Sequence, residues 1–240
     1  MKLMLRKELR LSLHPTAPMF LALSAMLLIP SYPYLVAFFY TGLAVFFTCL
    51  NGRENQDVFY SMLLPVAKRD IVRARFLTVS LLEAAQLLLG VPFAILRQRL
   101  MADPNPVGMD ANIALFGFAM MLLGLFNLVF FRVYYRDVRK VGTAFLWSSG
   151  AVFVFICLVE TCAHVVPFVR DMLDTPDPMF LPQKLLTLLA GLIIWALLTL
   201  TACRRAERDF EKQDLKRACG PEKRLPALCR EALLRFWGGV

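Results

Sequence analysis

Residues 185–202, LLTLLAGLIIWALLTLTA, decide which class of protein this chain belongs to. No charged side chain interrupts the stretch. An α-helix needs about 20 predominantly apolar residues, within a range of about 17–25, to cross the hydrocarbon core of a bilayer. We therefore predict that this stretch is a membrane-spanning helix.

Five further apolar segments precede it, and the composition of the whole chain agrees with membrane insertion. The chain is 58% hydrophobic and 19% charged, whereas soluble domains average about 45–50% and about 25%. We predict an all-α integral membrane protein with six transmembrane helices. The five other predicted spans are residues 16–29, 34–50, 72–96, 113–134 and 142–166.

The first of these segments is short and follows basic residues, as a cleavable signal peptide does. No small-residue cleavage site follows it, and the sequence PSYP at 30–33 leads directly into the next apolar run. We interpret the first two segments as a helical hairpin with a tight turn.

The distribution of basic residues predicts the orientation. The basic residues fall in the N-terminus, the loops after spans two and four, and the tail, apart from Arg97, Arg99, Arg170 and Lys184. Lys and Arg accumulate on the cytoplasmic side of membrane proteins. We expect both termini in the cytoplasm.

The net charge of +9 does not indicate a nucleic-acid partner, because the basic residues lie beside the apolar runs, where they face anionic lipid. The 6 cysteines include no C-x-x-C pair and the chain has 2 histidines, so we expect no metal site. No predicted polar external loop contains a cysteine, and we expect no disulfide framework.

Two terminal segments are polar or amphipathic. In residues 1–14, Leu5, Leu9 and Leu13 share one helix face and basic residues occupy the rest, which predicts a helix on the inner membrane surface. A disordered basic leader is the alternative. Residues 216–240 form a cytoplasmic basic tail whose end is either an interfacial helix or a frayed terminus.

The loop between spans two and three, residues 51–75, carries the most specific pattern. Pro65 precedes a helix start, Asp70 falls in the first turn, where the helix dipole favours an acid, and Arg69 and Arg73 lie four residues apart. The pattern predicts a rigid cytoplasmic helix continuous with span three, although a simple topology anchor has the same composition.

Polar residues inside the predicted spans are candidate functional groups, because buried charge is costly in a bilayer. Glu83, Gln86, Asn127 and Glu160 either line a substrate path or form interhelical hydrogen bonds. Glu160 and His164 lie four residues apart on one helix face, which would suit a membrane enzyme.

The strings KELRLSLHP (7–15), NGRENQDVFYSMLLPVAKRDIVRAR (51–75), NPVGMDANIALFG (105–117) and FEKQDL (210–215) carry a family resemblance. Residues 1–215 resemble a bacterial ABC transporter permease of the type-2 class, in the short six-span group found mostly in Gram-positive bacteria. The resemblance implies an N-terminal elbow helix at 1–14 and a coupling helix within 51–75 that contacts a separate ATP-binding subunit. The candidate coupling residues are Asp57, Lys68, Arg69, Asp70 and Arg73.

The resemblance also implies a function. Two permease chains, alike or different, pair with two ATPase chains that hold the ATP and Mg, and the cargo is a peptide, an antimicrobial or another amphipathic molecule. The motif G-x-x-x-x-G-K-[ST] does not occur, so we expect no cofactor and no catalytic residue in this chain. Two alternatives stay open: a membrane-embedded enzyme using Glu160 and His164, and a non-transporting sensor or scaffold.

Overall fold

The computed structural model describes residues 2–100 and 105–212, and every regular element in these ranges is helical. The all-α prediction is confirmed for this part of the chain, whereas the predicted tail at 216–240 lies outside it. The elements in order are α1 (Lys2–Lys7), the π-helical turn η1 (Glu8–Ser12), α2 (Ala17–Ala22), the 3-10 helix η2 (Leu23–Leu28), α3 (Leu35–Glu54), α4 (Asp57–Leu63), α5 (Lys68–Leu100), α6 (Ile113–Tyr134), α7 (Val141–Val165), the π-helical turn η3 (Val169–Leu173) and α8 (Leu181–Glu211).

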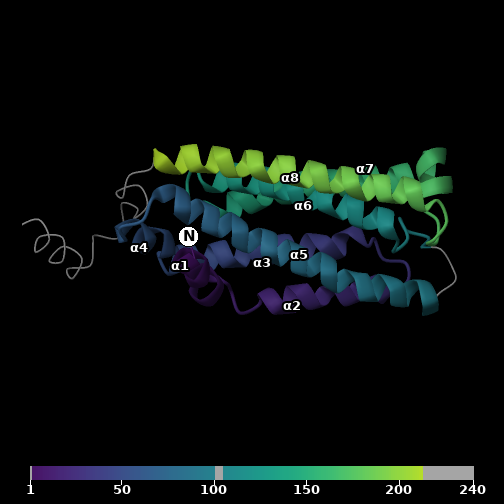
Figure 1. Ribbon diagram of the computed structural model, residues 1–240, viewed down its shortest axis with the longest axis horizontal. Coiled ribbons are helices and arrows are strands. Elements are labelled where there is room, and N and C mark those ends of the chain that lie inside the picture. The colour runs from purple at the N-terminus through teal and green to yellow at the C-terminus, as the bar shows by residue number, and fades with distance from the viewer. Residues whose placement is uncertain (1, 101–104, 213–240) are drawn as a thin grey trace, which may run out of the picture.

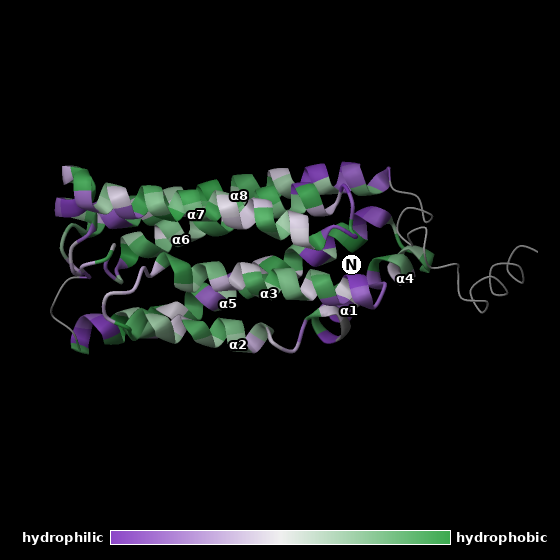
Figure 2. Cartoon of the chain, turned by 180° about the vertical axis from the view of Figure 1, so that it is seen from behind, coloured by the Kyte–Doolittle hydropathy of each residue, from purple (hydrophilic) through white to green (hydrophobic). Residues whose placement is uncertain are grey.

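Five of the described helices, α3, α5, α6, α7 and α8, are long and apolar enough to cross a membrane. They run along the long axis of the molecule (Figure 1). Hydrophobic residues occupy the middle of the bundle and hydrophilic ones gather toward its two ends (Figure 2). We call the end with α1, α4 and the C-terminus of α8 the basic end, and the end with residues 105–112 and η3 the far end.

The first predicted span differs from the other five. It forms α2 and η2, of 6 residues each. With rises of about 1.5 and 2.0 Å per residue, the pair extends about 21 Å, short of the roughly 30 Å hydrocarbon core. It packs beside α3 and α5 as half of the predicted hairpin. By length the described residues supply five spans, and a sixth crossing stays a prediction.

Glycines bring α6 and α8 into close backbone contact. A Cβ on Gly191 would lie 2.2 Å from the carbonyl oxygen of Gly117, and one on Gly124 would lie 2.9 Å from the Cα atom of Trp195. Without a hydrophobic driving force between helices in lipid, small residues permit the close packing that holds membrane helices together. This seam fixes α8 against the central helix α6.

Aromatic side chains fill the core toward the basic end of α6. The rings of Phe126 and Phe130 stack with centroids 5.2 Å apart, and Phe131 contacts Phe76 of α5 at 4.4 Å. Aromatic pairs at these spacings stabilise a core beyond the apolar area that they bury. The packing positions the neighbouring residue on α5, Arg75, at the edge of a dry interior.

Candidate functional site

A buried ion cluster joins three elements at the basic end. Arg75 on α5 is 3% exposed. Its Nε atom lies 2.6 Å from Glu8 Oε2, and its Nη2 atom lies 2.8 Å from Asp57 Oδ2. Glu8 belongs to η1 and Asp57 begins α4, so one guanidinium group ties the N-terminal segment and the loop helix to a spanning helix.

Three more side chains complete the cluster. Lys7 forms an ion pair with Asp57, and its Nζ atom donates to Ser61 Oγ at 2.8 Å. Ser12 Oγ donates to Asp57 Oδ2 at 3.1 Å. The cluster therefore holds two cations, Lys7 and Arg75, and two anions, Glu8 and Asp57. A buried charge is tolerated when it is paired and hydrogen-bonded, and this cluster meets that condition.

The ion cluster was predicted only in part. Asp57 was a candidate coupling residue, whereas Glu8 and Arg75 were not assigned a site role. Leu9 of the predicted apolar face is exposed, whereas Met4, Glu8 and Ser12 are buried; contact of residues 1–14 with the membrane surface stays a prediction. The sequence signal for this cluster was Glu8, an acidic residue within a basic N-terminal segment, because a buried carboxylate needs a cationic partner.

The predicted basic helix is confirmed as the first turns of α5, which begins at Lys68 with Asp70 in its first turn. Arg69 forms an ion pair with Glu211 of α8, and Arg73 Nε lies 2.6 Å from Glu207 Oε1. The arginine side chains are 59% and 49% exposed, so solvent screens each pair and its contribution to stability is small. Asp57 is thus turned inward, while the other four coupling candidates remain near the surface.

Polar side chains meet inside the bundle around Glu83, which is 1% exposed. Its Oε1 accepts from Asn127 Nδ2 at 2.8 Å, and its Oε2 accepts from the Trp195 indole at 2.8 Å. Asn127 Nδ2 also donates to Thr199 Oγ1 at 3.2 Å. These bonds connect α5, α6 and α8, as interhelical hydrogen bonds do in membrane proteins.

Gln86 lies one turn along α5 from Glu83 but bonds to a different helix. Its Nε2 donates to the carbonyl of Ala37 on α3 at 3.3 Å. Within the described residues, Gln86 Oε1 and Asn127 Oδ1 are buried without a hydrogen-bond partner. The structure therefore brings Glu83 and Asn127 together and leaves two acceptor oxygens unused in the same region of the bundle.

Glu160 belongs to the far end. Its Oε2 accepts from the backbone N–H of Met109 at 2.9 Å, and His164 Nε2 lies 3.3 Å from the carbonyl oxygen of Val107. Both side chains contact the backbone of residues 105–112 at different points, so they fasten this loop onto α7. Glu160 thus bonds to other partners than the Glu83 group, with which the sequence grouped it as lining a path or forming interhelical hydrogen bonds.

A polar network closes the far end. Asp177 Oδ1 pairs with the buried Lys184 Nζ at 2.9 Å, and its Oδ2 accepts from the backbone N–H of Ile113 at 3.1 Å. Asp174 Oδ1 accepts from the N–H of Asp110 at 2.7 Å. Burial raises the pKa of Asp174 to about 6 and also raises that of Asp110. These groups hold the starts of α6 and α8 together.

The chain matches one known family. The family model described as "ABC-2 family transporter protein" covers residues 3–203. No curated protein and no solved structure matches the chain. The matched range runs from α1 into the last turns of α8, and it includes the ion cluster, the Glu83 group and the far-end network.

Proposed function

We propose that this chain, which belongs to the ABC-2 family of transporter proteins, is the membrane permease subunit of an ATP-driven exporter. Family membership confirms the resemblance to type-2 ABC permeases, which are membrane components of transporters. The observation that carries the coupling mechanism is the Asp57–Arg75 ion pair, which links the loop helix α4 directly to α5.

The exposed face of α4 supports contact with a separate ATP-binding subunit. Tyr60, Leu63 and Leu64 are 53%, 42% and 48% exposed at the basic end. Lys68 and Arg69 follow closely in the chain, and both side chains contact Glu211 at the end of α8. An apolar centre with a polar rim is the usual composition of a protein interface. A displacement of α4 by the ATP-binding subunit would be transmitted to α5 through the Asp57–Arg75 ion pair.

The orientation follows from charge. The positive-inside rule supports a cytoplasmic basic end, with both termini on that side of the membrane and the far end outside. The remaining partners are a second permease chain, alike or different, and the lipid of a bacterial plasma membrane. ATP and Mg bind to the ATPase subunit, and the cargo class implied by the family is a peptide, an antimicrobial or another amphipathic molecule.

The Glu83 group is the best candidate for a substrate path. Asn127 Oδ1 and Gln86 Oε1 are buried acceptors that no described residue uses, which supports a role that begins when the helices separate. Glu83 would exchange its bonds to Asn127 and Trp195 for bonds to cargo or water. Glu160 Oε1 is also a buried acceptor without a described partner, but the bond of Oε2 to the far-end loop sets Glu160 apart from this group and makes it a weaker candidate for the path.

Two variants of the purified full chain test the coupling role. Gentle purification from native membranes should recover an ATP-binding subunit with the wild-type chain. Leu63→Asp should release that subunit, because it places a charge in the apolar contact. Asp57→Asn should retain the subunit but lose transport coupled to ATP hydrolysis, because it weakens the internal ion pairs of Asp57 with Arg75 and Lys7 and leaves the exposed face of α4 unchanged.

Charge reversal tests the surface arginines. Arg69→Glu with Arg73→Glu should uncouple transport from ATP hydrolysis at normal expression. Adding Glu207→Arg and Glu211→Arg restores the pairs with α8, so recovery would assign the effect to the α5–α8 contact rather than to the ATPase subunit. Recovery of the chain without any nucleotide-binding partner would contradict the transporter proposal.

A further inference from the structure

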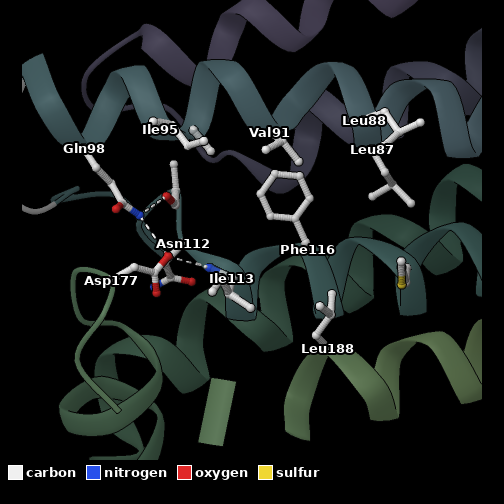
Figure 3. A pocket seen from close by; sticks show the side chains of 13 residues that line it. Leu87, Leu88, Val91, Ile95, Gln98, Asn112, Ile113, Phe116, Asp177 and Leu188 are labelled. Atoms are coloured by element: carbon white, nitrogen blue, oxygen red, sulfur yellow. Dashed lines mark hydrogen bonds between the residues drawn. The ribbon is translucent and has the colours of Figure 1, made fainter. Parts of the chain in front are cut away.

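A three-sided cleft opens between α5 and α8 toward the far end, with α6 as its floor (Figure 3). The Glu83–Trp195 bond ties α5 to α8 on the basic-end side of this cleft. Beyond that bond a cavity of about 450 Å³ lies between Val91 of α5, Phe116 of α6 and Leu188 of α8. This volume is within the range of about 300–1,000 Å³ found for small-molecule sites.

Apolar side chains form the walls and polar ones mark the far end of the cleft. Asn112 bonds to backbone groups through both of its side-chain polar atoms, and Asp177 is paired with Lys184. Gln98 Nε2 donates to the carbonyl of Ala111 at 2.6 Å and to Asp177 Oδ2 at 3.2 Å. Among the described contacts this leaves the Gln98 carbonyl oxygen as the acceptor available to a ligand.

The length of the cleft matches one leaflet of a bilayer. It follows α5 from Leu87 to Gln98, which is about 16 Å at about 1.5 Å per residue. Half of a hydrocarbon core of about 30 Å is nearly the same distance. The deep end is hydrocarbon and the shallow end offers one hydrogen-bond acceptor, so the cleft has the polarity of a lipid.

We propose that this cleft is a binding site for one acyl chain of a phospholipid in the far-end leaflet, with the Gln98 carbonyl oxygen accepting a hydrogen bond from the head group. An ethanolamine head group supplies such a donor, whereas a choline head group does not. That this leaflet is the outer one rests on the proposed topology.

The cleft offers an acyl chain more contact than the rest of the membrane-facing surface. A chain between α5 and α8 meets apolar atoms on three sides, whereas a chain on the open face of α7, at Leu146 or Phe153, meets them on one. Dispersion contacts are individually small and add up with their number. The bound lipid therefore exchanges more slowly than its neighbours and holds α5 and α8 apart beyond Glu83.

Two phenylalanine variants test the site with a matched control. Val91 and Leu89 lie on the same helix and are 42% and 43% exposed, but only Val91 lines the cleft. The full chain is placed in nanodiscs containing a phosphatidylethanolamine with a photoreactive group at the end of one acyl chain. Labelled peptides are then mapped by mass spectrometry.

We expect the label to concentrate on peptides containing residues 87–98 and 113–120. Val91→Phe should reduce this labelling by about tenfold, equivalent to about 1.4 kcal/mol of binding free energy, and Leu89→Phe should leave it unchanged. Unlabelled phosphatidylethanolamine should compete better than phosphatidylcholine of the same chains. If Val91→Phe fails to fold, Ala94→Leu fills the same cleft.

Three results would overturn the proposal. Label spread evenly over α5, α7 and α8 would mean contact with bulk lipid only. An equal response of the two phenylalanine variants would remove the cleft as the cause. Protection of the cleft peptides by a second copy of the chain would assign the surface to that copy. None of these measurements needs an ATPase subunit, so they can fail while the permease proposal stands, and the reverse also holds.

Discussion

Removing the guanidinium group of Arg75 should destabilise the protein far more than removing a neighbouring arginine. In Arg75→Met the unbranched apolar side chain occupies part of the same space but removes the close cation of Glu8, which is 1% exposed and then keeps only the longer contact of 3.5 Å with Lys7 Nζ. Breaking a buried ion pair by removing one partner costs about 3–5 kcal/mol. Arg73→Met, two residues away, breaks a pair whose arginine side chain is 49% exposed, so solvent screening makes its loss much less costly.

The free energy of unfolding can be measured in mixed micelles titrated with a denaturing detergent. A second variant tests the cause. Glu8→Gln combined with Arg75→Met removes one charge of each sign and leaves the Lys7–Asp57 pair intact. Replacing both members of a buried pair is often nearly neutral, so the double variant should recover most of the loss.

Two results would refute this reasoning. The first is a cost for Arg75→Met within about 1 kcal/mol of that for Arg73→Met, which would mean that the buried pair is no stronger than a surface pair. The second is a double variant whose cost equals the sum of the two single costs, because contacting residues should show a coupling energy of about 0.5–3 kcal/mol.

Three further predictions concern the interior of the bundle and its far end. Glu83→Leu should cost about 1–3 kcal/mol of unfolding free energy, because Trp195 loses its acceptor; Glu83→Gln keeps an acceptor and should cost less in the same titration. Gly191→Ala should lower the melting temperature, because its Cβ would overlap the carbonyl oxygen of Gly117 and such overpacking costs about 1–3 kcal/mol; Gly150→Ala, which meets no atom within 4 Å, should change little. Asp174 has a pKa of about 6 when folded and about 3.9 when unfolded, so the folded state holds the proton to higher pH. The stabilisation by protonated Asp174 is complete below about pH 4 and is lost as the pH rises to about 6. Asp174→Asn should therefore reduce the dependence of the melting temperature on pH between these values. An unchanged dependence would contradict the assignment.

The spanning helices were predictable because their signal is local. Residues 185–202 lie within α8 and residues 113–134 are α6 itself. The start of α5 followed from Pro65 and Asp70 for the same reason, since a proline and a first-turn acid act on their own helix. Whether the first predicted segment, residues 16–29, crosses the membrane could not be predicted, because it is shorter than the about 17–25 residues that a spanning helix needs.

The polar contacts were predictable only as candidates. Glu83, Gln86 and Asn127 were identified by their cost in a bilayer, but pattern alone could not show that Glu83 bonds to Asn127 and Trp195 while Gln86 bonds to α3. The rotation of each helix about its axis selects these partners. That rotation depends on side-chain packing against other helices, which no single segment contains.

The sequence by itself determined that this is a helical membrane protein, where its long helices lie and which end of the bundle is basic, because hydropathy and charge act along each segment separately. Only the tertiary structure decided that Glu8 meets Arg75, which lies 67 residues further along the chain, and that α5 and α8 leave a cleft beyond Glu83. Such contacts arise when helices pack, and their specificity comes from shape and distance between segments rather than from order along the chain.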